Sequence, residues 1–221
     1  RHCYHIPDVN QDVSEILKRH IGSYETHEVQ TEDGYILTLF RISRKNPKGV
    51  IFFQHPYAND ARIFHEMGYY DNYATLGYIR TKTQVSKIIY FGFSLSSASG
   101  LVYACLRPHE AAQSIKVMIN MAPAVLPRYV NSVILYFVPV ADFMENYVNL
   151  MLTQVGSEVS HKTLYHLIQI HRSGGNFRMY DYGKEENVRL YGKEEPPLYP
   201  LNKIKIPVLL VYSENDSLAP P

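Results

Sequence analysis

The chain has 221 residues, which is enough for one domain with a substantial hydrophobic core. Its hydrophobic content of 46% is ordinary for a globular protein, and its net charge of +1 argues against a nucleic-acid-binding surface or a polybasic membrane anchor. Two cysteines, Cys3 and Cys105, make neither a disulfide framework nor a zinc site, and they leave the redox compartment open.

The first part of the chain is predicted to form one helix and a β-hairpin. Residues 12–20 have apolar side chains at helical spacing, an acidic start and a basic end. Asp8, Asp12 and Glu15 are therefore interpreted as acids at a helix start and not as metal ligands. Residues 24–29 and 34–42 indicate two strands joined by Asp33-Gly34, and Asp-Gly is a strong hairpin signal.

Three later apolar runs indicate further strands, at residues 49–54, 115–121 and 206–212. The first is expected to be covered on both faces and the last to be buried. A helix is predicted over residues 66–82, although Gly68 and Gly77 weaken it. Strands that alternate with helices predict an α/β fold with a mainly parallel sheet, in which the hairpin forms an edge.

Residues 87–100 read K-I-I-Y-F-G-F-S-L-S-S-A-S-G. A short β-favouring run is followed by a serine between small residues and then by a helical segment, the pattern of the nucleophile elbow of α/β-hydrolases. The serine projects from a strained turn, so only small side chains fit two residues before and after it, here Gly92 and Ser96. The alternative is an ordinary strand-to-helix loop with a capping serine.

Residues 126–200 differ in character from the rest and are predicted to be a helical cap, inserted over the carboxyl ends of the strands where ligands bind in such sheets. Residues 133–137 together with Phe143 and Met144 are a candidate wall for an acyl chain, and a plain cap core is an equal alternative. The longest apolar run, residues 130–144, is too short to span a bilayer.

Several stretches together resemble the animal acid lipases, which include gastric and lysosomal lipases and insect digestive relatives. They are D-V-S-E-I-L-K-R-H, E-T-H-E-V-Q-T-E-D-G-Y-I-L-T-L-F-R-I, G-V-I-F-F-Q-H, Y-Y-D-N-Y-A-T-L-G-Y-I, the elbow, H-R-S-G-G-N-F-R-M-Y-D-Y-G-K-E-E-N and P-V-L-L-V-Y-S-E-N-D. They cover most of the chain in the family's order. The resemblance implies a single, partial α/β-hydrolase domain over residues 1–221, with a cap at about 126–200.

The resemblance also implies hydrolysis of neutral lipid esters, either acylglycerols or sterol esters, by a serine-aspartate-histidine triad. By position, Ser94 matches the nucleophile and Asp216 the triad acid, whose role is to orient the imidazole. The oxyanion hole would use the backbone N–H of Leu95 and that of Tyr57. His55, beside Tyr57, is interpreted as a packed structural histidine. The glycosylation motif at Asn215 is interpreted as chance, because it contains Asp216.

Four departures from the family bear on activity. The triad histidine should follow Asp216, but none does before Pro221, and His161, His166 and His171 precede Asp216 in the cap and are interpreted as structural. A central strand with its loop and helix is missing after His55, so the sheet should have a gap or re-pair. The elbow reads G-F-S-L-S where the family has G-H-S-Q-G, and the cap is short.

These omissions suggest a fragment, an incomplete gene model or a splice form. An alternative is a catalytically inactive relative that binds lipid or a partner, because a serine without a base is a poor nucleophile. The printed chain is therefore expected to lack Ser94-dependent ester hydrolysis. No metal, cofactor or nucleic acid is expected, and the partners would be a lipid ester and a lipid–water interface. The resemblance implies a secreted or lysosomal protein, with no leader in this sequence.

Overall fold

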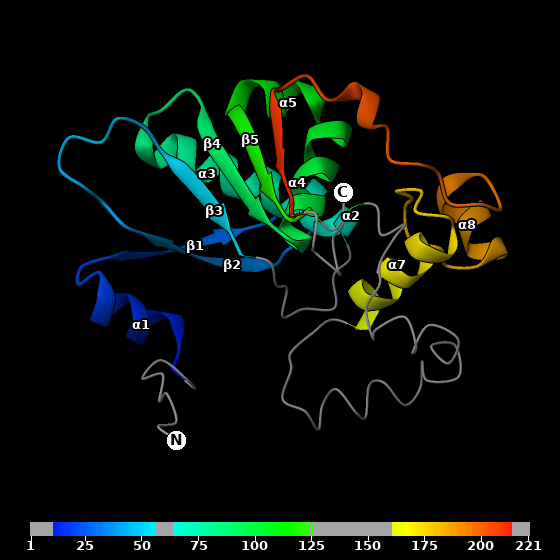
Figure 1. Cartoon of the computed structure of the whole chain (residues 1–221), viewed down its shortest axis with the longest axis horizontal. Helices are drawn as coiled ribbons and strands as arrows, with labels where there is room; N and C mark the ends of the chain where they lie inside the picture. Colours follow the sequence, from blue (N-terminus) through cyan, green and yellow to red (C-terminus); the bar gives the residue numbers. More distant parts are fainter. Residues whose placement is uncertain (1–10, 56–63, 124, 126–160, 214–221) are drawn as a thin grey trace. The chain divides into compact units, whose positions relative to one another are not determined.

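The computed structural model describes residues 11–55, 64–123, 125 and 161–213 (Figure 1). The chain divides into two compact units, Arg1–Lys48 and Gly49–Pro221. Each unit is described by itself.

The first unit holds helix α1 (Val13–His20) and the strands β1 (Glu25–Gln30) and β2 (Ile36–Arg41). The helix begins where predicted, because the carboxylate of Asp12 accepts a hydrogen bond from the backbone N–H of Glu15 at 2.9 Å. The strands pair in antiparallel register from Glu25 opposite Arg41 to Gln30 opposite Ile36. The predicted helix and hairpin are thus confirmed.

The turn of the hairpin is held by Thr31. Its hydroxyl accepts a hydrogen bond from the backbone N–H of Tyr35 at 2.9 Å and donates one to Asp33 at 2.5 Å. Gly34 has φ +92°, a backbone conformation that is unfavourable for any residue with a side chain. The two strands form a sheet of their own, so the prediction that the hairpin edges the main sheet was wrong.

The second unit is built on a four-stranded parallel sheet in the order β3-β4-β5-β6 (Figure 1). The strands are β3 (Ile51–Gln54), β4 (Ile88–Phe93), β5 (Ile115–Met121) and β6 (Val208–Val211). Their pairing in sequence order, with a helix between β3 and β4 and helices between β4 and β5, confirms the α/β class. It also brings the carboxyl ends of β3, β4, β5 and β6 to the same edge.

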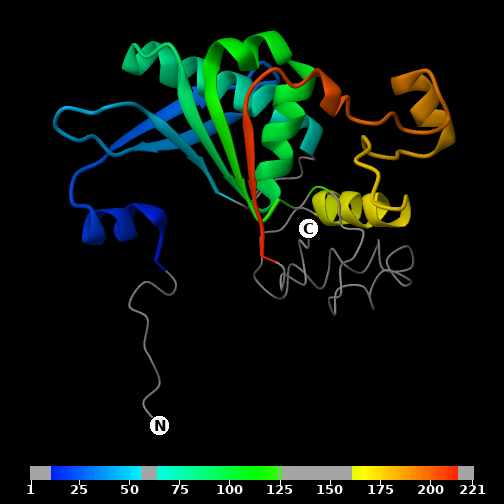
Figure 2. The ribbon, with the colours of Figure 1, turned by 45° about the horizontal axis from the view of Figure 1, so that its top comes forward.

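Helices cover one face of this sheet, as Figure 2 shows. They are α2 (Phe64–Glu66), a π-helical turn η1 (Met67–Asp71), α3 (Asn72–Thr83), α4 (Leu95–Leu106) and α5 (Pro108–Ser114). The first three are continuous and correspond to the helix predicted at 66–82. Gly68 lets this helix approach α4, since a Cβ there would lie 2.7 Å from the carbonyl oxygen of Ser99. Helix α5 was not predicted, although Pro108 is a good first residue for a helix.

The outer strands are less buried than predicted. β3 and β6 are the two edges of the four-stranded sheet, and Ile51 and Phe53 are each 64% exposed. Leu209 of β6 is 52% exposed. The expectation that residues 49–54 are covered on both faces and that residues 206–212 are buried was therefore wrong. An apolar run predicts a strand, but its neighbours decide how much of the strand is buried.

Beyond residue 160 the chain forms α7 (His161–Arg172) and α8 (Lys184–Tyr191), then a short 3-10 turn, η3 (Leu201–Lys203), that leads into β6. Ile170, Phe177 and Tyr199 are at least 95% buried and belong to the same hydrophobic core as the helices on the sheet. Residues 126–160 of the predicted cap, including the candidate acyl-chain wall, lie outside the described residues, and residues 161–200 are described.

Candidate active site

Ser94 lies at a sharp bend between β4 and α4. The strand ends at Phe93 and the helix begins at Leu95, and Ser94 between them has φ +57° and ψ −118°. Such a backbone conformation costs a serine roughly 1–3 kcal/mol and persists only where the surroundings impose it. The backbone N–H of Ser94 donates a hydrogen bond to the carbonyl of Met121 on β5 at 2.9 Å. This is the strand-to-helix geometry that the sequence pattern predicted.

The Ser96 hydroxyl closes the bend. It is buried and accepts a hydrogen bond from the backbone N–H of Phe93 at 2.7 Å. Its own proton can go to the carbonyl of Phe93 or to that of Gln54 at the end of β3, each 2.9 Å away. A serine is thus accommodated where a glycine was expected, because its hydroxyl links the bend to the neighbouring strand.

Two glycines let the bend and its helix approach the sheet. A Cβ on Gly92 would lie 3.0–3.1 Å from atoms of Tyr90, Asn120 and Ser97, which is tighter than ordinary contact. A Cβ on Gly100 would lie 2.6 Å from the ring of Tyr90, which has no room to accept it. Packing therefore requires a glycine at Gly92 and at Gly100, and the sequence pattern predicted this for Gly92.

A buried network of hydrogen bonds joins the bend to strands β3 and β4. The Tyr90 phenol, which is fully buried, can donate to the side-chain carbonyl of Gln54 or to the backbone carbonyl of Ser96 at 2.7 Å. The hydroxyl of Ser99 reaches the same two acceptors, at 3.3 Å and 3.0 Å. Burial raises the pKa of Tyr90 well above its usual value, so the phenol stays protonated and remains a donor.

Leu95 is the first residue of α4, as the predicted oxyanion role requires. The first N–H groups of a helix have no acceptor within the helix and carry its positive dipole end, so they are suited to a developing negative charge. Tyr57, the second predicted donor, lies outside the described residues. His55 directly follows β3, and partial burial lowers the pKa of its imidazole.

The chain leaves β6 at the edge of the sheet where Ser94 lies. Val211 pairs with Met121, and the backbone N–H of Ala122 donates to the carbonyl of Val211 at 2.7 Å. Met121 is also the residue whose carbonyl binds the N–H of Ser94. Asp216, the predicted triad acid, follows five residues later and lies outside the described residues, as does the glycosylation motif at Asn215.

No histidine is hydrogen-bonded to the Ser94 hydroxyl among the residues that the structure describes. His166 is fully buried and donates its Nε2–H to the carbonyl of Arg178 at 2.8 Å, against the edge of Tyr180. Burial lowers the pKa of His166 to about 4. This environment supports the structural interpretation of His166. His171 is partly exposed in the last turn of α7, and the side chain of His161 lies outside the described residues.

The supporting network was missed by sequence reasoning. Gln54 and Ser96 are 42 residues apart, so their contact has no local signature. The only available signal was the glutamine that ends the apolar run of β3, because a polar side chain in that position needs a partner when it is buried.

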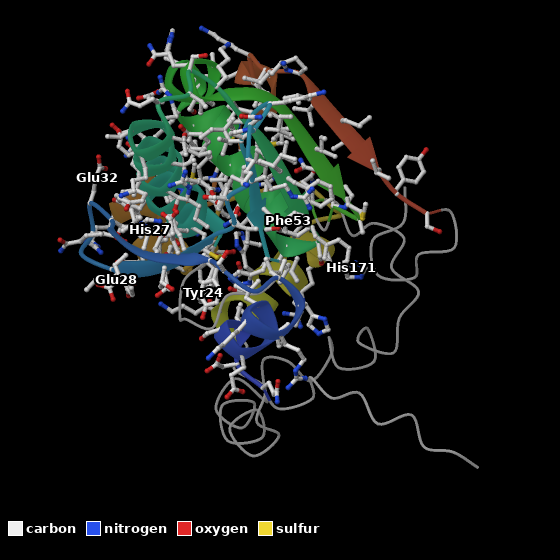
Figure 3. All side chains as sticks on the ribbon, turned by 90° about the vertical axis from the view of Figure 1, so that its left-hand side faces the viewer. Tyr24, His27, Glu28, Glu32, Phe53 and His171 are labelled. Atoms are coloured by element: carbon white, nitrogen blue, oxygen red, sulfur yellow. The ribbon has the colours of Figure 1, made fainter. Side chains whose placement is uncertain are left out.

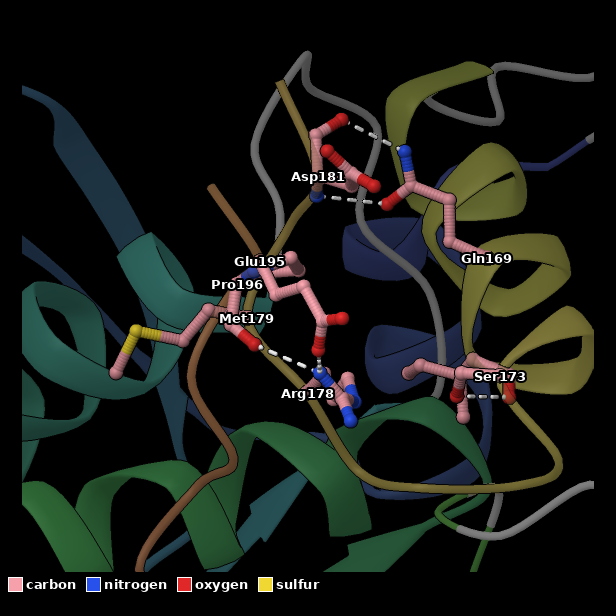
Figure 4. Close-up of a pocket in the computed structure, with 8 residues that line it drawn as sticks. Gln169, Ser173, Arg178, Met179, Asp181, Glu195 and Pro196 are labelled. Atoms are coloured by element: carbon pink, nitrogen blue, oxygen red, sulfur yellow. Dashed lines mark hydrogen bonds and ion pairs between the residues drawn. The ribbon is translucent and has the colours of Figure 1, made fainter. Parts of the chain in front are cut away.

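A pocket of about 280 Å³ lies between α7 and the segments around residues 178–181 and 195–196 (Figure 4). Its polar groups bind one another. Arg178 contacts Glu195 at 3.0 Å, and the amide of Gln169 bonds the backbone of Asp181 at 2.8 Å and 2.9 Å. No elbow residue lines it, so it is separate from the candidate active site.

The described residues include neither a metal-binding cluster nor a membrane-spanning helix. No cluster of three or more histidine, cysteine, aspartate or glutamate side chains is arranged there to hold a metal ion. The described helices include none with the length and apolar character needed to cross a membrane.

Comparisons with known proteins find similarity to lipases. Residues 13–68 match the family model described as a partial alpha/beta-hydrolase lipase region. "Lipase member N" of Mus musculus is 23% identical over 97% of this chain and 80% of its own length. "Lysosomal acid lipase/cholesteryl ester hydrolase" of Macaca fascicularis is 27% identical over 54% of this chain and 44% of its own length.

The alignment to the mouse protein is 322 positions long, whereas this chain has 221 residues. At about a hundred positions of the alignment, the mouse protein therefore has a residue and this chain has a gap. Among solved structures, an alpha/beta fold family hydrolase from Bacillus anthracis matches 89% of this chain and 84% of that chain, with 16% identity and a TM-score of 0.43. The family model and the lipase relatives agree with the resemblance seen in the sequence. The chain is thus similar to the animal acid lipases, which supports a lipase-like α/β-hydrolase.

Proposed function

We propose that this chain acts on carboxylic esters of neutral lipids, either acylglycerols or sterol esters, with Ser94 as the nucleophile. The observation that carries the proposal is the backbone of Ser94, with φ +57° and ψ −118° at the end of a buried strand. A strained serine in this position, held by the hydrogen bonds of Ser96, is the arrangement that projects a hydroxyl toward substrate. The similarity to lipases supports the substrate class.

The reaction that fits this site is acyl transfer. The Ser94 oxygen attacks the ester carbonyl carbon while a base takes its proton, and the alcohol leaves to give an acyl-enzyme that water then hydrolyses. The backbone N–H of Leu95 would stabilise the negative charge on the carbonyl oxygen, and removing one such donor typically slows an enzyme by about 10²–10³-fold. Tyr57 would supply the second N–H and Asp216 the carboxylate that orients the base.

A second candidate is a protein that binds neutral lipid or a partner without cleaving an ester. It is favoured by one observation, which is that the described residues include no histidine hydrogen-bonded to the Ser94 hydroxyl. A serine hydroxyl without a base is a weak nucleophile near neutral pH.

Fatty-acid release separates the two candidates. The chain is incubated with emulsified triacylglycerol and with a sterol ester, with and without added imidazole as an external base, beside the Ser94→Ala variant. The proposal predicts imidazole-dependent release that Ser94→Ala abolishes. Binding of either lipid by both proteins, with no Ser94-dependent release under any condition, would favour the second candidate. Ser97→Ala is a matched control, because it removes a neighbouring hydroxyl and leaves the bend intact.

The similarity to gastric and lysosomal lipases also supports a secreted or lysosomal location and action at a lipid–water interface. This location can be tested by expressing the coding sequence in cells and measuring whether the product is in the medium, the lysosome or the cytosol.

A further inference from the structure

Strand β3 is joined to the bend of the candidate active site through its last residue, Gln54. The backbone carbonyl of Gln54 lies 2.9 Å from the hydroxyl of Ser96. Its side-chain oxygen can accept from the phenol of Tyr90, and it lies 3.3 Å from the hydroxyl of Ser99. Two oxygens of one residue therefore face three hydroxyl donors, which come from the strand and the helix that meet at Ser94.

The side chain of Gln54 lies on the face of the sheet that the helices cover. The register pairs Gln54 with Gly92, two residues beyond Tyr90, and alternate residues of a strand point to the same face. Phe53, which is labelled in Figure 3, points to the other face, where its ring stacks on that of Phe91 with the centroids 4.5 Å apart. The pairing of β3 with β4 thus directs the amide of Gln54 toward α4.

The two hydroxyls that face this amide need both of the acceptors beside them. Tyr90 and Ser99 are at most 1% exposed, and each has one proton to donate. Their other acceptor is the backbone carbonyl of Ser96, at 2.7 Å and 3.0 Å. Ser96 is the second residue of α4, so its carbonyl also accepts within the helix, and one lone pair remains for a hydroxyl. Without Gln54, one of the two buried hydroxyls would lose its acceptor.

The carbonyl of Ser96 belongs to the same helical turn as the predicted oxyanion donor. Leu95 is the first residue of α4, and the N–H groups of a first turn have no acceptor within the helix. A shift of the Ser96 carbonyl would tilt this turn and change the direction of the Leu95 N–H relative to Ser94. Catalysis is sensitive to such changes, because a misplacement of about 1 Å can cost about 10²-fold in rate.

We propose that Gln54 is a positioning residue of the candidate active site, which holds the first turn of α4 and so aligns the Leu95 N–H with the Ser94 hydroxyl. The proposal rests on the proposed function, because it names a residue that supports the same reaction. Gln54 is also the residue from which the chain continues to Tyr57, the second predicted donor, three positions later. It acts through its hydrogen bonds and does not touch the ester.

The first test is the kinetics of Gln54→Leu, which removes the acceptor and keeps a side chain of similar size. Initial rates of 4-nitrophenol release are measured at one imidazole concentration over a series of ester concentrations, and the rate of Ser94→Ala is subtracted. We expect the apparent kcat to fall by about 10–100-fold and KM to change by less than about threefold, because a donor to the transition state is misplaced. Gln113→Leu, the same substitution at an exposed position of α5, should change neither constant.

A double variant tests whether Gln54 acts through the buried phenol. Tyr90→Phe removes the hydroxyl that the amide of Gln54 binds. If the two residues act as a unit, Gln54→Leu combined with Tyr90→Phe lowers kcat by about the larger of the two single effects. A loss in the double variant that equals the product of the two single losses would contradict this route.

Amide hydrogen exchange tests the positioning without any catalysis. The backbone N–H groups of Phe93 and Ser94 are hydrogen-bonded within the bend, at 2.7 Å and 2.9 Å. Gln54→Leu should speed their exchange by at least about tenfold relative to the amides of α8. Gln54→Glu keeps an acceptor oxygen and should leave this exchange unchanged.

The results separate this proposal from the proposed function. A parent without Ser94-dependent release would refute the proposed function, and the exchange measurement would still decide whether Gln54 holds the bend. A kcat and an exchange pattern that Gln54→Leu leaves unchanged would overturn the proposal. So would a loss of protection that is equal in α8, because Gln54 would then only stabilise the fold. If Gln54→Leu does not fold, Tyr90→Phe takes its place, since it breaks the same contact.

Discussion

The hydroxyl of Ser96 accepts the backbone N–H of Phe93 at 2.7 Å, and this hydrogen bond spans the bend that carries Ser94. The same hydroxyl can donate to the carbonyl of Gln54 on the adjacent strand. The hydroxyl of Ser96 therefore helps to hold the strained conformation of Ser94. Ser96 occupies the position at which the elbow pattern usually has a glycine.

Removing this hydroxyl should destabilise the fold. Ser96→Ala leaves the buried N–H of Phe93 without its acceptor, which typically costs about 1–3 kcal/mol in the free energy of unfolding. Urea unfolding followed by circular dichroism measures the change. Ser97→Ala is the control, because Ser97 is equally buried one residue along and its hydroxyl has no partner in the described part of the chain. Equal losses in both variants would contradict the role given to Ser96.

Gly100→Ala should be destabilising although alanine favours helices. The new Cβ would lie 2.6 Å from the Tyr90 ring, and overpacking of this kind usually costs about 1–3 kcal/mol. Gly77→Ala in α3 has no atom within 4 Å of the new Cβ and should stabilise the protein by about 0.5–1 kcal/mol. The two variants differ only in their surroundings, so thermal unfolding that moves both in the same direction would refute the described packing.

Burial of His166 should make stability depend on pH. Its pKa is lowered to about 4 by burial, against 6.5 for an ordinary histidine. The unfolded chain therefore binds the extra proton first as the pH falls, so stability is complete above pH 6.5 and declines toward pH 4. The loss from this group is on the order of 3 kcal/mol. Urea unfolding across this range should show a shallower decline in His166→Gln than in the parent, and identical slopes would argue against the prediction.

Cys105 should be chemically silent in the folded protein. It is 1% exposed, and burial raises the pKa of its thiol to about 12, so almost no thiolate forms near neutral pH. In a Cys3→Ser background, a thiol reagent should label Cys105 only as urea unfolds the chain. Rapid labelling without denaturant would show that the core around α4 opens readily or is packed differently.

Most elements were predictable from sequence because local patterns encode them. The Asp12 cap, the Asp33-Gly34 turn and the apolar run of β4 each specify structure through near neighbours. The bend at Ser94 was predictable for the same reason, since its small flanking residues occur within a few positions.

What the sequence did not reveal depends on distant partners. The burial of β3 and β6 is set by which strands lie beside them, and neither run encodes its neighbours. The network of Tyr90 and Gln54 joins residues 36 positions apart and leaves no periodic signal. The roles of Tyr57 and Asp216 stay predictions, because both residues lie outside the described parts of the chain.

The central claim is that the hydroxyl of Ser94 attacks the ester. The most direct measurement is the rate of 4-nitrophenol release from a short-chain nitrophenyl ester as the imidazole concentration rises, for the parent and for Ser94→Ala. We expect no Ser94-dependent rate without imidazole. With imidazole, we expect a rate that exceeds that of Ser94→Ala at every concentration. Equal rates in the two proteins throughout, with both shown to be folded, would contradict the account.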